Sequence, residues 1–429
     1  MERKANGPSV LHHDLTHFLP SLEHSSSRKL RSSRLYQGLR TEIRRVLRSV
    51  VQESWTRRPT PGLRKIRVLA WNIERGLRLD GIVTALRDDP RLGADLYLLT
   101  ELDWGMARTQ NRAVAQEIAR ALELNYVFGP CYMCLSKGTG PDHRVKEENT
   151  LSLHGNALLS RYPLERVHTL ELPNGTDKMR GREKRIGCER AVLARVHHPL
   201  GRFWVVCLHL DAHSSQRHRH REMKLVLDHL EGLSPPLPVL LGGDWNTSTY
   251  NSKRPLYAIL GYCRRVLMGI GRVIRDHYPH PDRWFERLLF RELERRGYGY
   301  RDCNELGKNT LHYHVDNSVL NQNMAEWLPL WCFWFIRWAL KRHQYRCSMK
   351  LDWFAARGIR PAPGCSARVV DGLQDSKGPL SDHDPILLDL LPLSASDADL
   401  HESNTKDFAE SAGRDHSLRR APTGAQRSR

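Results

Sequence analysis

The sequence predicts an α/β protein whose strands and helices pack in layers. From Ile66 onward, short apolar runs of strand length alternate with longer amphipathic stretches of helical length. Such alternation is typical of sheets that are covered by helices. Its length of 429 residues suits one large domain with extra segments, or two ordinary domains.

The candidate strands are short apolar runs bounded by polar or turn-forming residues. They are Ile66–Trp71, Leu96–Thr100, Ala157–Ser160, Ala191–Val196, Phe203–Leu210, Val239–Leu241, Leu351–Ala355 and Ile386–Leu390. Two candidate helices, at about Arg112–Leu124 and Ser215–Leu230, carry apolar residues three or four positions apart. Ser214 is a candidate N-cap of the second helix.

The chain is strongly basic, with a formal net charge of +19. This favours polyanionic partners, namely nucleic acid, anionic membrane surfaces or phosphorylated substrates, without choosing among them. Nine dispersed cysteines, among which only Cys131 and Cys134 form a C-x-x-C pair, predict free thiols rather than a zinc site. Since no signal peptide and no apolar run of roughly 20 residues is found, we expect a cytoplasmic protein without a transmembrane span. Peripheral membrane contact stays open.

The two ends of the chain differ in composition from its middle. Residues 1–33 are polar and without periodicity, which predicts a flexible N-terminal segment. Residues 34–62 are expected to form a basic amphipathic helix, from Arg34 to about Ser54, and a linker. The helix could dock on the neighbouring domain or lie on an anionic membrane, and docking is the commoner arrangement. Residues 394–429 are expected to be a disordered tail.

Residues 251–350 break the alternation of strands and helices and are expected to form an insertion. They contain basic helical stretches and then an apolar block, Trp327–Leu340, that is rich in tryptophan. The block is too short to span a bilayer. Burial, a wall of the substrate cleft and interfacial membrane contact are the alternatives, because tryptophan favours places with one apolar and one wet side.

Polar residues stand next to several predicted strands, where they could bind a cation or transfer a proton. They are Asn72 and Glu74, Glu101 and Asp103, His209 and Asp211, Asp244 and Asn246, Asp352, and Ser381–Asp384. Taken singly, each has an ordinary explanation as a turn, a core histidine or a solvated charge. Because all six groups lie beside hydrophobic strands, coincidence explains the whole set poorly.

The ordered set of motifs resembles the endonuclease/exonuclease/phosphatase superfamily. The motifs are Trp71-Asn72-Ile73, Thr100-Glu101, Gly155-Asn156-Ala157, His209-Leu210, Gly243-Asp244-Trp245-Asn246, Leu351-Asp352 and Ser381-Asp382-His383. The resemblance runs from about Ile66 to Leu390 and implies a domain over residues 63–393, with the insertion at about 251–350. It also implies a DNase I-like fold, a four-layered α/β sandwich of two packed mixed β-sheets flanked by helices.

The resemblance implies a metal site. Glu101 would be the main ligand, with Asn72 and Asp382 nearby, and Asn156 would help to order the site. Carboxylate and amide oxygens suit Mg²⁺ or Mn²⁺ better than zinc.

The resemblance also implies the catalytic residues. Asp244 would orient or deprotonate the attacking water, and Asn246 would donate a hydrogen bond to a phosphate oxygen. His383, held by Asp352, would face the phosphate, and His209 would be a second donor to it. The reaction implied is attack of water on phosphorus, as in a phosphodiesterase or nuclease.

Three functions remain open for the site. A nuclease would combine a basic groove with stacking aromatics. A membrane-associated lipid phosphodiesterase or phosphatase, similar to sphingomyelinases, would use the Trp327–Leu340 block and the basic helix. A non-catalytic phosphate-binding module is disfavoured because every core position is filled. Arg108 is a candidate to lie near the cleft, and Arg161 and Arg190 are candidates to meet phosphate or, equally, to be surface residues. Residues 217–221 are expected to be a solvated basic face. The sequence predicts no oligomeric state.

Overall fold

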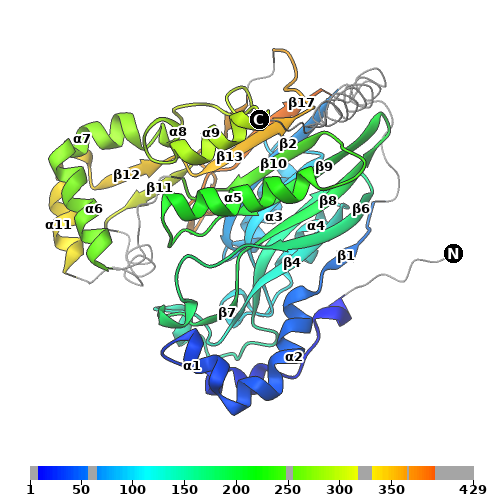
Figure 1. Cartoon of the computed structure of the whole chain (residues 1–429), viewed down its shortest axis with the longest axis vertical. Coiled ribbons are helices and arrows are strands. Elements are labelled where there is room, and N and C mark those ends of the chain that lie inside the picture. Colours follow the sequence, from blue (N-terminus) through cyan, green and yellow to red (C-terminus); the bar gives the residue numbers. More distant parts are fainter. Residues whose placement is uncertain (1–7, 57–64, 248–254, 317–330, 365–366, 392–429) are drawn as a thin grey trace, which may run out of the picture.

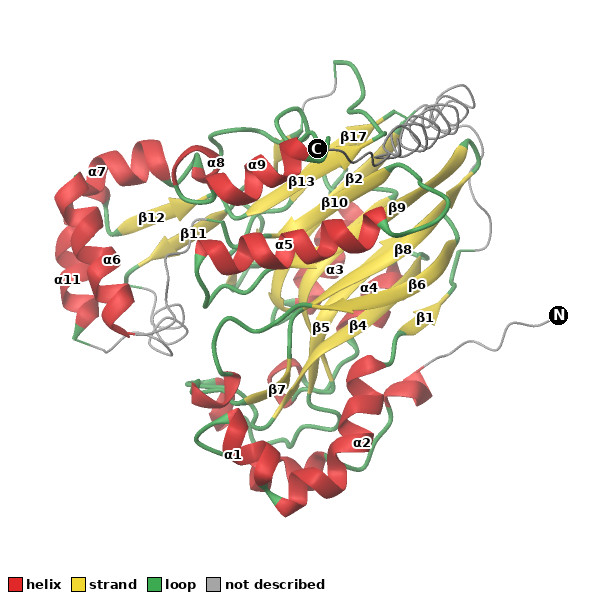
Figure 2. Cartoon of the chain, in the orientation of Figure 1, coloured by secondary structure: helices red, strands yellow, loops and turns green. Residues whose placement is uncertain are grey.

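The computed structural model describes residues 8–56, 65–247, 255–316, 331–364 and 367–391, and it is organised around two β-sheets (Figures 1 and 2). The predicted tail and most of the predicted linker lie outside these ranges. Among the described residues, no helix is both long enough and apolar enough to cross a membrane.

The first sheet is mixed, because β2 and β3 run parallel while the other neighbours pair antiparallel. Its strand order is β1 (Val51–Glu53), β4 (Asn125–Cys134), β5 (Leu153–Ser160), β3 (Leu96–Trp104), β2 (Ile66–Arg75), β17 (Ile386–Leu390) and β14 (Arg368–Val369), with β7 (Arg185–Gly187) paired to β4.

The second sheet is also mixed, with β9 and β10 parallel. Its strand order is β13 (Asp352–Arg357), β10 (Val239–Asp244), β9 (Gly201–His209), β8 (Arg190–His198) and β6 (Leu164–Glu171). All eight predicted strands are present in the two sheets, although most extend beyond the predicted bounds.

Helices cover the outer face of each sheet. Helices α2 (Arg34–Arg48), α3 (Leu79–Asp88) and α4 (Val114–Ala121) pack on the first sheet. Helices α5 (Gln216–Glu231) and α9 (Arg287–Arg295) pack on the second, and Figure 1 shows α5 lying across its strands. The N-cap of α5 is Ser215, whose hydroxyl accepts a hydrogen bond from the N–H of His218, rather than the predicted Ser214.

Alternation along the strands builds three apolar layers from the two sheets. In β2, Val68 and Ala70 point into the layer between the sheets, whereas Leu69 and Trp71 point to the helices. Successive side chains of a strand face opposite sides, so one strand serves two layers. The predicted four-layered α/β sandwich is therefore confirmed.

The N-terminal segment is folded against the sandwich from residue 8 onward, and the prediction of a flexible segment over 1–33 is wrong for this part. Short 3-10 helices at Pro8–Leu11 and Thr16–Leu22 precede α1 (Ser27–Ser32). Leu11, Leu19 and Leu22 are buried in the same core as α2. Helix α2 docks on the domain through Ile43, Val46 and Leu47.

The region predicted as an insertion divides into two parts. Helix α9 belongs to the main sandwich. The rest comprises α6 (Pro255–Met268), α7 (Ile270–Arg272), α8 (Pro281–Trp284) and α11 (Cys332–Leu340), with the hairpin β11 (Leu311–His314) and β12 (Arg346–Met349). Figure 1 shows α6, α7 and α11 gathered at the end of the molecule beyond this hairpin. Two further short strands, β15 (Gln374–Asp375) and β16 (Gly378–Pro379), form a separate hairpin.

Candidate active site

The predicted polar residues meet at one edge of the sandwich, where strands of both sheets end. The second sheet contributes Asp244 from β10, which lies in register with His209 of β9 and with Asp352 of β13. The first sheet contributes Asn72 of β2, and its Nδ2 donates a hydrogen bond of 3.1 Å to Oδ2 of Asp244. This bond joins the two sheets at the site. Close packing of the sheets brings together residues that are far apart in sequence.

Asp244 lies at the centre of the group. Besides Asn72, its Oδ2 has Nε2 of His209 at 3.6 Å and Nε2 of His383 at 3.8 Å. Its Oδ1 accepts a hydrogen bond of 2.9 Å from the N–H of Asn246. Burial raises the pKa of Asp244, while His383 opposes the rise. The carboxylate is thus held between two imidazoles, with a pKa shifted toward the range useful to a general base.

His383 is fixed on several sides. Its Nδ1 donates a hydrogen bond of 2.8 Å to Oδ2 of Asp352, which is fully buried. Its carbonyl accepts a hydrogen bond from the indole N–H of Trp71, and its N–H donates to the hydroxyl of Ser381. Thr310 in turn accepts a hydrogen bond from the N–H of Asp352. Burial opposes charge on the imidazole, but Asp352 and Asp244 outweigh it and raise the pKa of His383 well above its ordinary value.

His209 has a carboxylate on each side. Nδ1 lies 3.5 Å from Oε2 of Glu189, and Nε2 lies 3.7 Å from Oε1 of Glu101. Burial would lower the pKa of His209, but Glu189, Asp244 and Glu101 raise it to about 10. The neighbouring carboxylates therefore favour the charged form of both site histidines. Glu189 is a residue that the sequence analysis missed, although it lies two residues before the predicted strand Ala191–Val196.

Two of the three site asparagines, Asn156 and Asn246, make contacts that order the backbone. Oδ1 of Asn156 accepts a hydrogen bond of 3.3 Å from the N–H of Glu101. Nδ2 of Asn246 donates one of 2.9 Å to the carbonyl of Leu210. Asn246 has a φ of 51°, so its backbone is left-handed. Residues other than glycine in that region are strained and are frequent at functional sites.

Local irregularities in β2 and β3 direct further acids to the same edge. The pairing of the two strands shifts register between Asn72 and Arg75, and Glu74 and Glu101 have φ values of 46° and 57°. Bulges of this kind change the direction of a side chain beside an active site. Glu74 appears in the predicted strand-end set but was not assigned to the metal site.

The carboxylates of Glu74, Glu101 and Asp382 form a partly exposed acidic group. Burial, with the neighbouring Asp382, raises the pKa of Glu74 to about 8, and burial also raises the pKa of Asp382. Burial opposes charge on Glu101, but His209 and other cations lower its pKa to about 2. Mutual repulsion among hard oxygen donors is the condition that a bound divalent cation relieves, so these residues fit Mg²⁺ or Mn²⁺.

In the observed orientation, the side-chain amide of Asn72 presents its N–H, rather than its oxygen, to the acidic group. Its Nδ2 donates to Oε1 of Glu101 at 3.1 Å as well as to Asp244, and its Oδ1 accepts from the N–H of Glu74. A role as oxygen ligand would need the amide to rotate. Asp244, Asp352 and His383 also lie within 4.8 Å of one another, as metal ligands do. We favour catalysis for these three, since Asp352 already uses Nδ1 of His383.

The structure thus brings all nine predicted site residues together, whereas the neighbouring arginines are engaged elsewhere. Arg108 is buried in ion pairs with Asp103 and Glu183. Arg161 pairs with Asp95, and Arg190 pairs with Glu171. The basic stretch 217–221 is not wholly a solvated face, because Arg219 is completely buried in an ion pair with Glu286.

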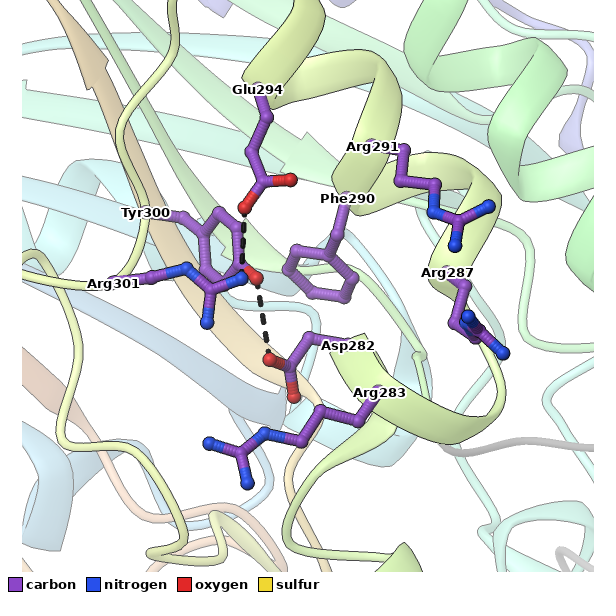
Figure 3. Close-up of a pocket in the computed structure, with 8 residues that line it drawn as sticks. All are labelled: Asp282, Arg283, Arg287, Phe290, Arg291, Glu294, Tyr300 and Arg301. Atoms are coloured by element: carbon purple, nitrogen blue, oxygen red, sulfur yellow. Dashed lines mark hydrogen bonds and ion pairs between the residues drawn. The ribbon is translucent and has the colours of Figure 1, made fainter.

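A pocket of about 240 Å³ lies apart from these residues, at helices α8 and α9 (Figure 3). Its lining includes four arginines around Phe290 and Tyr300, namely Arg283, Arg287, Arg291 and Arg301. Arg301 pairs with Glu294, and Tyr300 donates a hydrogen bond to Asp282. None of the predicted catalytic or metal residues lines it.

The fold and the edge site define a DNase I-like α/β sandwich with acidic and histidine side chains at its strand ends. The chain matches the Endonuclease/Exonuclease/phosphatase family over residues 69–383, which include all nine predicted site residues. The chain belongs to this family. The family implies hydrolysis of phosphoesters.

Individual relatives are distant. The uncharacterized protein YbhP of Escherichia coli strain K12 is 28% identical over 134 residues, which are 31% of this chain and 46% of YbhP. The chain therefore spans less than half the length of the curated relative that it matches.

The solved structures to which the chain is similar are also distant. An endonuclease/exonuclease/phosphatase from Beutenbergia cavernae is 15% identical with a TM-score of 0.45, covering 77% of this chain and 72% of that one. The human Nocturnin catalytic domain is 15% identical with a TM-score of 0.39, covering 80% and 97%.

Proposed function

We propose that the protein is a divalent-metal-dependent phosphoester hydrolase of the phosphodiesterase or nuclease type. The observation that supports this most directly is the position of Asp244. Its Oδ2 lies within 3.8 Å of the Nε2 atoms of two cationic histidines and 3.1 Å from the amide of Asn72. A carboxylate beside fixed positive charge suits activation of water next to an anionic phosphate.

Asp244 is the proposed general base. It accepts a proton from water as the water oxygen attacks phosphorus, and charge grows on the non-bridging and leaving oxygens. Its hydrogen bonds from Asn72 and Asn246 hold the carboxylate in one orientation. Such positioning is part of the catalytic advantage, since a misplaced base loses much of its effect.

His383 and His209 are the proposed phosphate-facing cations. Asp352 holds Nδ1 of His383, which leaves its Nε2 directed toward the side of Asp244. In the same way, Glu189 lies against Nδ1 of His209 and leaves its Nε2 directed toward Asp244. Both imidazolium groups offset negative charge on the phosphate, and they need no reorganisation because their partners already fix them.

Glu101, Asp382 and Glu74 are the residues that would hold Mg²⁺ or Mn²⁺, with Asn72 beside them. A bound divalent cation would offset charge on the phosphate oxygens and orient the phosphate. The role of Glu74 is an addition to the ligands predicted from sequence. Glu74 is included because its carboxylate interacts electrostatically with those of Asp382 and Glu101.

The experiment is a substrate panel with the purified chain and its Asp244→Asn variant. An activated phosphodiester, a phosphomonoester, DNA, RNA and a phospholipid are supplied with Mg²⁺ or Mn²⁺ and then with chelator. We expect metal-dependent turnover of at least one substrate, and a loss of about 10²–10⁴-fold in the variant. The control is Asp88→Asn, which changes an exposed aspartate of α3. Turnover that survives chelation, or an Asp244→Asn variant as active as the control, would contradict the proposed mechanism.

A further inference from the structure

Helix α11 exposes a stripe of large aromatic side chains. Trp331, immediately before the helix, is 57% exposed, and Trp334, Phe335 and Trp338 are 66%, 42% and 59% exposed. Their spacing of three, four and seven residues places them on one helical face. Burial was one of the alternatives for the block Trp327–Leu340, and for these four side chains the structure contradicts it; residues 327–330 lie outside the described ranges.

Helix α6 lies beside α11 and also exposes large apolar side chains (Figure 1). The two helices are joined by a hydrogen bond of 2.8 Å from the hydroxyl of Tyr262 to the carbonyl of Phe335. The aromatic face is defined here as the exposed apolar residues of both helices, namely Trp331, Trp334, Phe335, Trp338, Leu256, Tyr257, Leu260 and Leu267. A grouping of this kind on a protein surface is typical of an interaction site.

The insertion has a small core that contains no residue of the aromatic face. It is formed by Val273, Tyr278, Tyr313, Val315, Leu340 and Cys347. Leu340 contributes to that core from the end of α11, while Trp334 and Trp338 point to solvent. The helix is therefore amphipathic in an unusual sense, since its exposed side carries the larger apolar groups.

Basic side chains outnumber acidic ones around the aromatic face, although Arg337 of α11 is paired with Asp316. Residues 255–277 and 331–346 contain eight lysines and arginines, and Asp276 is their one acidic residue. Asp276 pairs with Arg275. Lys341, Arg342 and Arg346 follow α11 directly and are exposed. A partner of matching chemistry combines an apolar layer with negative charge at its surface.

We propose that the aromatic face docks on an anionic phospholipid membrane. Tryptophan and tyrosine favour the boundary between acyl chains and headgroups, and lysine and arginine attract anionic headgroups. Helices that lie in this interface combine the same two features. The proposal concerns attachment alone and holds whichever phosphoester is cut.

Docking would also orient the catalytic edge, because the insertion is hydrogen-bonded to the loop that carries Asp382 and His383. Strand β11 bridges Leu311 to His383, and the N–H of His312 donates a hydrogen bond of 3.2 Å to the carbonyl of Asp382. The N–H of Asp384 donates one of 2.7 Å to the carbonyl of Thr310. The loop that carries His383 and the hairpin that leads to the aromatic face are thus held together by backbone hydrogen bonds rather than by a free linker.

The test is sedimentation of the full chain with phospholipid vesicles. Vesicles of phosphatidylcholine mixed with phosphatidylserine are compared with vesicles of phosphatidylcholine alone. We expect binding to the anionic vesicles, with a shift of tryptophan fluorescence to shorter wavelength. The triple variant Trp331→Gln/Trp334→Gln/Trp338→Gln should bind on the order of 100-fold more weakly, because three apolar contacts are lost. Glutamine retains helix propensity, and circular dichroism would check the fold.

Two matched controls separate binding through the aromatic face from non-specific hydrophobic or electrostatic binding. Leu200→Gln/Leu225→Gln/Leu391→Gln removes three exposed apolar side chains elsewhere and should leave binding unchanged. Lys341→Gln/Arg342→Gln should weaken binding to anionic vesicles more than Arg287→Gln/Arg291→Gln, which removes two arginines of the pocket in Figure 3. Equal losses in the two charge variants would assign binding to net charge and overturn the proposal.

Three other results would also overturn the proposal. They are no sedimentation of the wild type, unchanged binding of the tryptophan variant, and a wild-type dimer that the tryptophan variant dissociates in analytical ultracentrifugation. The dimer would assign the face to a second copy of the chain.

Discussion

His383 donates a hydrogen bond of 2.8 Å from Nδ1 to Oδ2 of Asp352, although 31 residues separate the two in the chain. Asp352 is fully buried at the start of β13, next to Asp244 in the sheet. In the proposed mechanism this bond leaves Nε2 of His383 to face the phosphate, and the buried carboxylate of Asp352 favours the charged imidazole. We therefore propose that Asp352 is a positioning residue that acts through His383.

Replacing Asp352 with asparagine should lower kcat while leaving the fold nearly intact. Asparagine keeps the shape of the side chain and removes the charge that raises the pKa of His383. We expect a loss of about 10²-fold or more in kcat, with a smaller change in KM. NMR titration should find a lower pKa for His383 in the variant, which a purely structural role of Asp352 would not produce. An unchanged pKa would contradict the assignment.

Glu189 should act on His209 in the same way. Its Oε2 lies 3.5 Å from Nδ1 of His209 and contributes to raising the pKa of that imidazole to about 10. In Glu189→Gln we expect the pKa of His209 to fall and kcat to decrease by about tenfold or more. The matched control is Glu171→Gln, which changes a half-exposed glutamate near the same strands. Equal activity of the two variants would leave Glu189 with a structural role only.

The site could be predicted from sequence to the extent that each residue adjoins a recognisable strand. Asn72, Glu101, His209 and Asp244 follow apolar runs, and the structure brings them together. Glu189 directly precedes β8, yet it was missed because its contact with His209 depends on how β8 lies beside β9 in the sheet. Second partners of catalytic residues depend on tertiary contacts that local patterns do not contain.

Two parts of the fold could not be predicted from the sequence, and the reasons are physical. Strand β4 runs from Asn125 to Cys134 through Gly129 and Pro130, which normally indicate a turn. The pairing register shifts after Pro130, and proline is tolerated at such a bulge. The N-terminal segment has leucines spaced too irregularly for a helix, yet Leu11 and Leu19 are buried in the same core as the apolar side of α2. Burial there follows from tertiary packing rather than from periodicity.

The ion pairs of Asp389 should make stability depend on acid pH. Burial alone would raise its pKa, but hydrogen bonds of 2.7 Å from Arg67 and from Lys65 lower it to about 2. Because the folded pKa lies below the ordinary value, the stabilisation is complete above about pH 4 and is lost as the pH falls toward 2. Asp389→Asn should lower the free energy of unfolding by about 1–2 kcal/mol at neutral pH. Urea unfolding should show this difference shrinking near pH 3, and a constant difference would contradict the linkage.

Removing one partner of the buried ion pair between Arg219 and Glu286 should lower the free energy of unfolding strongly, whereas replacing both partners should lower it little. Arg219 of α5 and Glu286 at the start of α9 are both fully buried, and their ion pair joins the two helices over the second sheet. Arg219→Met would leave Glu286 without its partner, and we expect a loss of about 3–5 kcal/mol in the free energy of unfolding. Burial already raises the pKa of Glu286 to about 7 against the pull of Arg219, so the unpaired glutamate should take up a proton.

The double variant Arg219→Met/Glu286→Leu distinguishes the pair from its surroundings. If the loss comes from an uncompensated buried charge, replacing both partners with apolar side chains should restore stability to within about 1–2 kcal/mol of the wild type. Urea unfolding of the two single variants and the double variant gives the coupling energy directly. Additive losses would mean that Arg219 stabilises the α5–α9 contact through its other neighbours, Ser214 and the carbonyl of Asp211, rather than through Glu286.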